Sequence, residues 1–381
     1  MGAETKRECL EKTRRRYRGA GRKYKKIILD EFCATWDYNR KYAIDLLNGK
    51  TAKKGGRRGR PARYGKAEHR VLERIWLAAN RPCSRRLKAI LPSWMPFYEQ
   101  QYDRLDPCAR KNLLRISKNS IDRLLKPTRR KYGSRGRSGT RPGTQLLHQI
   151  PIKTSHWDIS EPGFMQADTV AHGGDSMEGD FAHSLTLTDI CSAWTENRAT
   201  WNKGAYGVME QIRDIEQVLP FAIQGFHSDN GKEFLNHHLY RYYVKRKEPV
   251  WMTRGRPRHG NDQSHVEQKN WSHVRLLLGY QRIDDPCLIP MMNELYRAWG
   301  LFNNFFCTNL KLIKKTKVGS RYKKKYDDPK TPYQRLMESE HLNEAQKTHL
   351  TEIYCNLNPF KLKKQIDSKQ RRILNALRSG H

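Results

Sequence analysis

The sequence lacks long apolar runs, paired cysteines and histidines near its N-terminus. No apolar run approaches the about 20 residues that a bilayer-spanning helix needs, and no signal peptide is visible, so we expect no membrane segment. The 8 cysteines are scattered without a C-x-x-C pair, which favours free thiols in a reducing cytosol over a disulfide framework. Only His69 precedes His148, so the N-terminal region cannot hold a zinc module built from two histidines, and we expect no zinc.

Acidic residues are also scarce, and their distribution is informative. The chain has 74 Lys and Arg against 39 Asp and Glu, a net charge of +35. Residues 1–150 hold 40 basic and 13 acidic residues, residues 151–300 hold 16 and 19, and residues 301–381 hold 18 and 7. Two basic arms therefore flank a near-neutral centre, which indicates a polyanionic partner, most simply nucleic acid. A ribosomal or nucleoid-coating protein is the plainest alternative, but it would not need an acidic, structured middle.

The first basic arm begins with a region typical of DNA-binding proteins. Residues 1–22 form a lead-in in which we expect no fixed structure. Apolar spacing predicts a helix over 24–36 with Ile27, Ile28, Phe32 and Trp36 inward, a turn, and a second helix over 40–47. This order resembles a helix-turn-helix over residues 1–49, with a plain helical hairpin as the alternative.

A basic linker, KTAKKGGRRGRPARYG, follows over residues 50–65. Its Arg58-Gly59-Arg60-Pro61 string resembles the AT-hook tripeptide, because extended arginines suit the narrow minor groove of A·T runs. We therefore assign Arg58 and Arg60 as DNA contacts. The same RGRP string recurs at 254–257, and a solvated basic linker explains the segment equally well.

Residues 66–128 read as a second helical DNA-binding domain, with helices over 66–80, 84–91 and 109–125. Ser117 can cap the last helix, ISKNSIDRLLK, which is typical of a recognition helix. Its outward face would carry the DNA contacts Lys118, Asn119 and Arg123, while an ordinary amphipathic helix is the alternative. Residues 129–149 form another basic linker.

The centre of the chain, residues 150–306, alternates extended and helical patterns. Three strands come first, then helices and strands in turn, and a long helix over 288–306 closes the region. We expect strands over 164–170, 183–188, 194–201, 222–226 and 250–253, and helices over 205–218, 234–244 and 261–278. Asn261 or Asp262 can cap the last of these.

Three carboxylates stand at special points of this pattern. Asp168 ends the first strand, Asp229 follows the fourth, and Glu267 lies on the helix over 261–278. Displacement at phosphorus can be assisted by two Mg²⁺ ions that stabilise the attacking and leaving oxygens. Mg²⁺ takes hard oxygen ligands, and ligands on strands and helices are held firmly. The trio therefore predicts metal-dependent chemistry on a phosphodiester.

The segments around these acids, GFMQADTVAHGG, HSDNGKEF and HGNDQSHVEQKN, resemble the Asp-Asp-Glu core of retroviral-type integrases and insertion-sequence transposases. The likeness is greatest to the transposase branch with an N-terminal helix-turn-helix, and it covers residues 150–306. It implies an RNase H-like α/β core, a mixed five-stranded sheet flanked by helices. Strands one and four would lie side by side in it, which would bring Asp168 next to Asp229.

The resemblance also implies a cofactor and partners. Asp168 would bridge two Mg²⁺ ions, with Mn²⁺ as a substitute, while Asp229 would hold the first and Glu267 the second. The partners would be double-stranded DNA, as terminal repeats and as target, in at least a homodimer. Lacking the N-terminal zinc module, the chain departs from the integrase branch.

Other polar residues of the centre receive supporting roles. We expect Asp189 to form a turn or to support the site from behind, with replacement of one of the three carboxylates as the alternative, and we expect Glu233 to cap the helix that follows it. Lys269, Asn270 and His273 follow Glu267 on its helix and are predicted DNA contacts, with solvent exposure as the alternative. Mg²⁺ disfavours imidazole, so the neighbouring histidines are read as structural or DNA-contacting: His172, His227 and His265.

The tail, residues 307–381, is basic, and we expect it to be mostly helical, with helices over 343–356 and 359–377. It shows no recognisable chemistry. The whole pattern predicts a transposase that performs metal-dependent 3′-end cleavage and strand transfer, located in the cytoplasm on a prokaryotic nucleoid. The alternatives are an RNase H-like nuclease acting on hybrids or junctions, and a catalytically dead DNA-binding relative.

Overall fold

The computed structural model describes residues 3–49, 63–132, 159–256, 263–318 and 321–379. By contacts the chain divides into two units, Met1–Arg63 and Tyr64–His381, each described here by itself. Arg58 and Arg60, the predicted minor-groove contacts, lie outside the described residues, as do the candidate caps Asn261 and Asp262.

The first unit is a small three-helix cluster: α1 (Ala3–Gly19), α2 (Arg22–Trp36) and α3 (Arg40–Leu47). The expectation of an unstructured lead-in over residues 1–22 is wrong, because Tyr17 of α1 is buried in the same apolar cluster as Phe32. Asn39 caps α3 by accepting from the Lys41 N–H at 3.0 Å. Ile27 was expected inward but is 51% exposed, since the buried face of α2 is formed by Ile28, Leu29 and Phe32.

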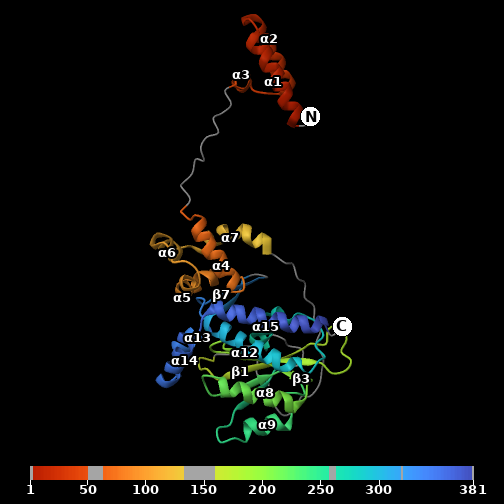
Figure 1. The fold of residues 1–381 in the computed structure, drawn as a ribbon, viewed down its shortest axis with the longest axis vertical. Coiled ribbons are helices and arrows are strands. Elements are labelled where there is room, and N and C mark those ends of the chain that lie inside the picture. The colour runs from red at the N-terminus through yellow and green to blue at the C-terminus, as the bar shows by residue number, and fades with distance from the viewer. Residues whose placement is uncertain (1–2, 50–62, 133–158, 257–262, 319–320, 380–381) are drawn as a thin grey trace. The chain divides into compact units, whose positions relative to one another are not determined.

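The second unit begins with four helices (Figure 1). Helix α5 runs through Pro92 and Pro96, well beyond the expected end at residue 91. The helix expected over 109–125 is two helices, because the chain turns at residues 115–117. Ser117 begins the second of them by accepting from the Ser120 N–H at 3.1 Å. Their bounds are α4 (Lys66–Ala78), α5 (Ser84–Gln101), α6 (Pro107–Leu114) and α7 (Lys118–Tyr132).

A five-stranded mixed sheet forms the centre of this unit, in the order β3-β2-β1-β4-β5. The first three strands are antiparallel neighbours, whereas β4 is parallel to both β1 and β5. The side-by-side placement of strands one and four, expected from the family resemblance, is thereby confirmed. The strands are β1 (Phe164–Ala171), β2 (Ala182–Asp189), β3 (Thr195–Trp201), β4 (Gly225–Ser228) and β5 (Trp251–Arg254).

Helices flank this sheet. Figure 1 shows α12 (Leu288–Phe306) and α15 (Pro359–Ser379) on one side, and α8 (Ala205–Val218) and α9 (His237–Val244) on the other. Helix α12 packs against β3 and α15, and α8 also contacts β3. All seven residues of β3 except Trp201 are buried, as expected of a strand covered on both faces.

The helices before the sheet share its apolar core. Trp94 of α5 is fully buried and meets Phe302, Phe306 and Phe360 edge-on, with ring centroids 6.1, 6.3 and 5.3 Å away. Its indole N–H donates to the Phe306 carbonyl at 3.2 Å. The segment expected as a separate second domain is therefore packed against α12 and α15.

The tail contains more than the two expected helices. After α12 come an antiparallel pair, β6 (Leu312–Val318) and β7 (Arg321–Tyr326), and the short helix α13 (Pro332–Met337). The expected helices follow as α14 (Glu344–Asn356) and α15. None of the helices in the described part of the chain combines the length and apolarity that crossing a bilayer requires.

Candidate active site

Two of the three predicted carboxylates lie on adjacent strands, close to each other. In the parallel pairing of β1 with β4, Ala167 is the partner of Ser228. Asp168 and Asp229 are the next residues along the two strands, so the register brings them close together. Asp229 follows the end of β4, whereas Asp168 does not end its strand as expected, because β1 continues to Ala171 in pairing with β2.

The Asp168 carboxylate is held by two hydrogen bonds. Its Oδ1 accepts from the Thr169 N–H at 2.8 Å, and its Oδ2 accepts from the Asn270 amide at 2.6 Å. Burial, and after it the Asp229 charge, raise the pKa of Asp168 from 3.8 to about 7, although the two hydrogen bonds oppose the rise. Crowded negative charge of this kind is what a divalent cation bound by the two carboxylates would relieve.

Asp229 opens a tight turn, as expected. Its Oδ1 accepts from the Gly231 N–H at 2.9 Å, and the Asn230 amide donates to the Gly255 carbonyl at 3.2 Å. Burial raises the pKa of Asp229, the neighbouring Glu233 charge adds to the rise, and the Lys203 charge opposes it. Both aspartates are thus buried enough to disfavour their charged forms.

Glu233 is a part of the site that the sequence did not reveal. It was expected to cap the next helix, but α9 is capped by Asn236, whose Oδ1 accepts from the Leu239 N–H at 2.9 Å. Glu233 is instead buried, 2.6 Å from the Lys203 ammonium and 2.9 Å from the Thr169 hydroxyl. Thr169 follows Asp168 directly, so this cluster connects the turn of Asp229 to the strand of Asp168.

Glu267 lies on the short helix α10 (Ser264–Lys269), which is tied to β1 because the Val266 N–H donates to the Gln166 side chain at 3.3 Å. The Glu267 side chain is exposed, although partial desolvation by the surrounding protein raises its pKa. The Glu267 charge also raises the pKa of Asp168. Among the described residues, no group of three or more His, Cys, Asp or Glu is arranged to hold a metal ion. The two aspartates offer the oxygen donors that Mg²⁺ prefers, whereas Glu267 does not complete a group of three with them in this structure.

The helix changes its winding directly after Glu267. Residues Asn270–Arg275 form a π-helical turn, a feature found mostly at functional sites. The wider turn rotates His273 inward, where it is 3% exposed and contacts Asn197 Oδ1 at 3.1 Å. The predicted DNA contact of His273 is therefore wrong, because the prediction assumed ordinary helical spacing.

Asn270 and Lys269 also differ from the expectation of DNA contacts. The Asn270 amide is occupied by Asp168, so this residue orients a carboxylate. The Lys269 ammonium donates to the Ala193 carbonyl at 3.4 Å, and burial lowers its pKa to about 8. Both side chains face the protein in this structure rather than an open groove.

Asp189 has the turn-forming role that was predicted. It is fully buried and accepts from the Gly163 N–H at 2.9 Å and from the N–H and hydroxyl of Ser192, both at 2.6 Å. Two of the three histidines are also structural: His172 contacts the Ser184 hydroxyl at 2.7 Å and His227 the Thr253 hydroxyl at 2.9 Å. His265 is partly buried, which lowers its pKa to about 4.

The predicted recognition helix presents the expected face. Lys118, Asn119 and Arg123 of α7 are exposed, whereas Ile121 and Leu125 are buried. Their contact with DNA stays a prediction. The second RGRP string differs in its surroundings, since Arg254 is buried and donates to the Asn230 side chain at 3.2 Å.

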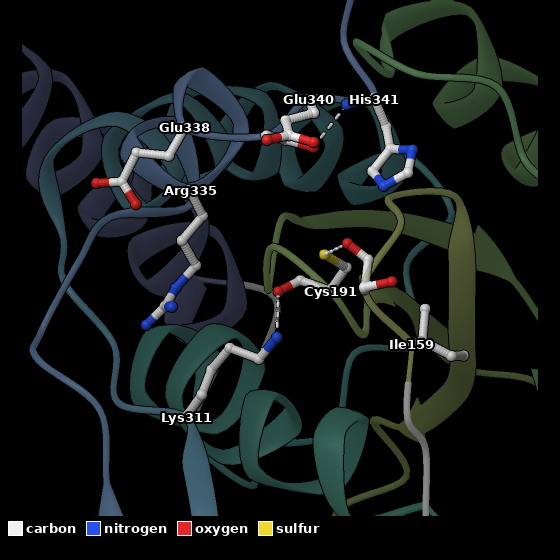
Figure 2. A pocket seen from close by; sticks show the side chains of 9 residues that line it. Ile159, Cys191, Lys311, Arg335, Glu338, Glu340 and His341 are labelled. Atoms are coloured by element: carbon white, nitrogen blue, oxygen red, sulfur yellow. Dashed lines mark hydrogen bonds between the residues drawn. The ribbon is translucent and has the colours of Figure 1, made fainter.

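A pocket of about 420 Å³ lies apart from the aspartate pair, between the loop after β2 and the tail (Figure 2). Cys191, Lys311, Arg335 and His341 line it together with Glu338 and Glu340. Figure 2 shows the Lys311 ammonium turned toward the Cys191 backbone carbonyl, to which it donates. Neither aspartate of the candidate site lines this pocket, so it is a separate feature.

No protein-family model matches the chain. Over 336 residues the chain is 34% identical to the uncharacterized protein y4rM of Sinorhizobium fredii, covering 87% of this chain and 95% of that protein. Among solved structures it is similar to the catalytic core domain of BIV integrase, with 18% identity, a TM-score of 0.30, and coverage of 47% of this chain and 96% of that one. It is also similar to a chain of a simian T-cell lymphotropic virus intasome in complex with the PP2A regulatory subunit B56 gamma. The identity is 13% and the TM-score 0.28, with coverage of 48% of this chain and 59% of that one. Likenesses this low do not establish an activity.

Proposed function

This chain belongs to the family of the Sinorhizobium fredii protein y4rM, and we propose that it is a DNA transposase of the Asp-Asp-Glu type. One observation carries the proposal. Asp168 and Asp229 each follow the Ala167–Ser228 pair of the parallel strands β1 and β4, and the charge of Glu267, from a later helix, raises the pKa of Asp168. A close pair of carboxylates with a third that acts on it electrostatically, in a chain that also carries basic arms, suits chemistry on a phosphodiester.

The carboxylates would hold divalent cations, Mg²⁺ or Mn²⁺, with Asp168 and Asp229 as the central pair. Such ions, when bound, stabilise charge on the attacking and leaving oxygens. The protein's own part is to position the donors. Asn270 fixes one oxygen of Asp168, the Gly231 N–H fixes one of Asp229, and the Lys203–Glu233 pair supports both strand ends.

The remaining parts of the proposal concern DNA. Basic residues outnumber acidic ones 40 to 13 in residues 1–150, which suits binding of the element's terminal repeats by the N-terminal helices. Joining two DNA ends to a target requires at least two active sites, so a homo-oligomer is part of the proposal. A hydroxyl of the cut DNA end can serve as the second nucleophile, so no covalent protein intermediate is needed.

The test uses the full chain and DNA that flanks its own reading frame. We expect inverted repeats there, and we expect purified protein to nick at their 3′ ends and to join them to plasmid DNA with Mg²⁺ or Mn²⁺. Ca²⁺ should support binding with little chemistry. Cleavage of RNA–DNA hybrids without any cutting of the repeats would favour the nuclease alternative and overturn the proposal, as would full activity in chelator.

A further inference from the structure

The β6–β7 hairpin, residues 312–326, is rich in basic residues. With Lys311, the segment KLIKKTKVGSRYKKKY has 8 Lys or Arg and no Asp or Glu. Five of the lysines have described side chains, and all five are exposed: Lys314, Lys317, Lys323, Lys324 and Lys325. Within the described part of the chain, none of them forms an ion pair with an acidic side chain.

The pairing of the two strands concentrates this charge. Lys314 lies directly opposite Lys325, and Thr316 lies opposite Lys323, so three lysines share one face. Lys317 and Lys324 belong to the other face. Like charges opposite each other destabilise a hairpin, and a two-stranded ribbon alone is only marginally stable in water.

Neither core packing nor edge protection explains this composition. The apolar residues of the ribbon are exposed, Ile313 and Val318 each by 61%. Lysines on an exposed strand do prevent edge-to-edge association. That role requires charge along the free edges, however, and not opposed lysines on one face together with further lysines on the other. The uncompensated charge therefore indicates a polyanionic partner.

The base of the ribbon is fixed to the body of the unit. The Lys311 N–H donates to Asp327 at 2.7 Å, and the Asp327 N–H donates back to the Lys311 carbonyl at 3.0 Å. Asp327 also lies 2.6 Å from the Arg335 guanidinium, and its carbonyl accepts from Arg85 of α5 at 2.9 Å. Figure 1 labels β7 next to α5 accordingly.

The base of the ribbon and the helix of Glu267 contact the same loop after β2. The Lys269 ammonium, two residues after Glu267, donates to the Ala193 carbonyl of the loop after β2 at 3.4 Å. The Lys311 ammonium bonds the Cys191 carbonyl in the loop that Asp189 shapes. A duplex that reaches Glu267 would therefore pass near the base of the ribbon.

We propose that the β6–β7 ribbon is an arm that binds the phosphate backbone of double-stranded DNA beside the carboxylate site. A two-stranded ribbon fits the major groove of B-form DNA, with lysines of its two faces directed toward the flanking phosphates. The identity of the partner as DNA rests on the proposed function, while the need for a polyanion rests on the ribbon alone.

The first test compares binding of a 40-base-pair duplex by the full chain across a salt series. The ribbon variant replaces its five described lysines with Gln. A control variant removes the same charge elsewhere by changing exposed residues to Gln: Lys245, Lys247, Lys361, Lys364 and Arg378. We expect the slope of log K against log salt to be less negative by about 2 to 4 in the ribbon variant than in wild type. Its Kd should be about 10- to 100-fold higher. An equal loss in the control would show a general charge effect and overturn the proposal.

A second measurement needs no variant. Brief acetylation of the wild-type chain, read by mass spectrometry, should modify the ribbon lysines in the free protein and spare them when duplex is bound. The control lysines should react equally in both states. Ribbon lysines that stay reactive on saturated duplex, or that are protected by duplex RNA of the same length but not by DNA, would contradict the proposal.

The two proposals can fail separately. If DNA protects the ribbon but Asp229→Asn protein still joins DNA ends, the arm stands and the catalytic assignment falls. If Asp229→Asn abolishes joining while the ribbon lysines remain reactive on DNA, the catalytic assignment stands and the arm is refuted.

Discussion

At the scale of single residues, Asp168 carries the largest electrostatic cost in the candidate site. Burial and the neighbouring Asp229 raise its pKa from 3.8 to about 7. A carboxyl whose pKa is raised on folding destabilises the folded state as pH rises above its unfolded pKa, and the cost is complete above the folded pKa. Metal-free protein therefore bears this cost fully above about pH 7 and loses it toward pH 4.

Asp168→Asn should consequently stabilise the metal-free protein in a pH-dependent way. The amide keeps the shape and removes the buried charge. In chelator at pH 8 we expect the free energy of unfolding of the variant to exceed that of wild type by on the order of 1–4 kcal/mol, with the difference closing toward pH 4.5. Saturating Mg²⁺ should also narrow the gap, because it stabilises only the wild type. Thermal unfolding over this pH range measures it, and a pH-independent difference would contradict the assigned cause.

Asn270 should act through Asp168. Its amide lowers the pKa of that carboxyl, so Asn270→Ala should raise it further and move the acid limb of the activity profile to higher pH. We expect about a tenfold drop in the strand-transfer rate at pH 7, partly recovered at pH 8.5. Ser272→Ala is the matched control, since its hydroxyl contacts only backbone carbonyls of its own helix. A pH profile of Asn270→Ala that matches wild type would contradict the effect of Asn270 on the pKa of Asp168 and would leave it a packing role alone.

The sequence predicted the site only in part, for reasons visible at single residues. Asp168 and Asp229 could be found because each stands in a recognisable motif on or just after a strand, although Asp168 lies inside β1 and not at its end. Lys203 and Glu233 could not, because they meet only through the tertiary fold, and a spacing of four residues from Asp229 equally fits a helix cap. His273 was misplaced because nothing in the sequence marks a π-helical turn.

At the scale of elements, amphipathic helices were predicted best. The bounds expected for α8 and α12 agree with the structure at both ends, because their apolar spacing is regular. Strand β4 was expected about three residues too early, since Phe221 and Ile223 are apolar and buried without belonging to the strand. The β6–β7 ribbon was missed entirely, because strands made of lysine lack the alternating apolar pattern that marks a half-buried strand.

Trp94 tests how α5 is joined to the helices that flank the sheet. Its ring is fully buried among three phenylalanines from α12 and α15. Trp94→Ala should lower the free energy of unfolding by about 3–5 kcal/mol, through lost burial and the cavity that remains. Phe97→Leu, a smaller change at a partly buried ring of the same helix, is the control, with less than half that cost. Chemical denaturation measures both, and equal small effects would show that α5 is not part of the core.

At the scale of the whole molecule, the chain consists of a small basic unit and a larger unit that contains the three candidate carboxylates. Residues 1–63 contain 20 Lys or Arg and 7 Asp or Glu, and their apolar cluster is distinct from that of the larger unit. The helices of residues 66–132, by contrast, share the core of the sheet. A fragment of residues 1–150 would therefore lack the phenylalanines that cover Trp94 and would expose this apolar face to solvent.

Deletion of residues 1–63 should separate recognition from folding. We expect the protein lacking residues 1–63 to unfold within a few degrees of the full chain, because it keeps its entire apolar core. Its preference for terminal repeats over random duplex should fall at least about tenfold, with a shallower salt slope. Calorimetry and competition binding check the two parts. If the shortened protein keeps its preference for the repeats, the first unit does not recognise them, and the exposed face of α7 becomes the candidate for recognition.

The most direct test of the account is strand transfer by carboxylate variants of the full chain. Asp229→Asn and Glu267→Gln should each reduce joining of repeat ends to target DNA by at least about 1,000-fold while leaving binding of the ends unchanged or slightly stronger. Asp189→Asn is the control, since its carboxyl holds a turn, and it should keep partial activity. Near wild-type joining by Asp229→Asn or Glu267→Gln protein would contradict the assignment of this site.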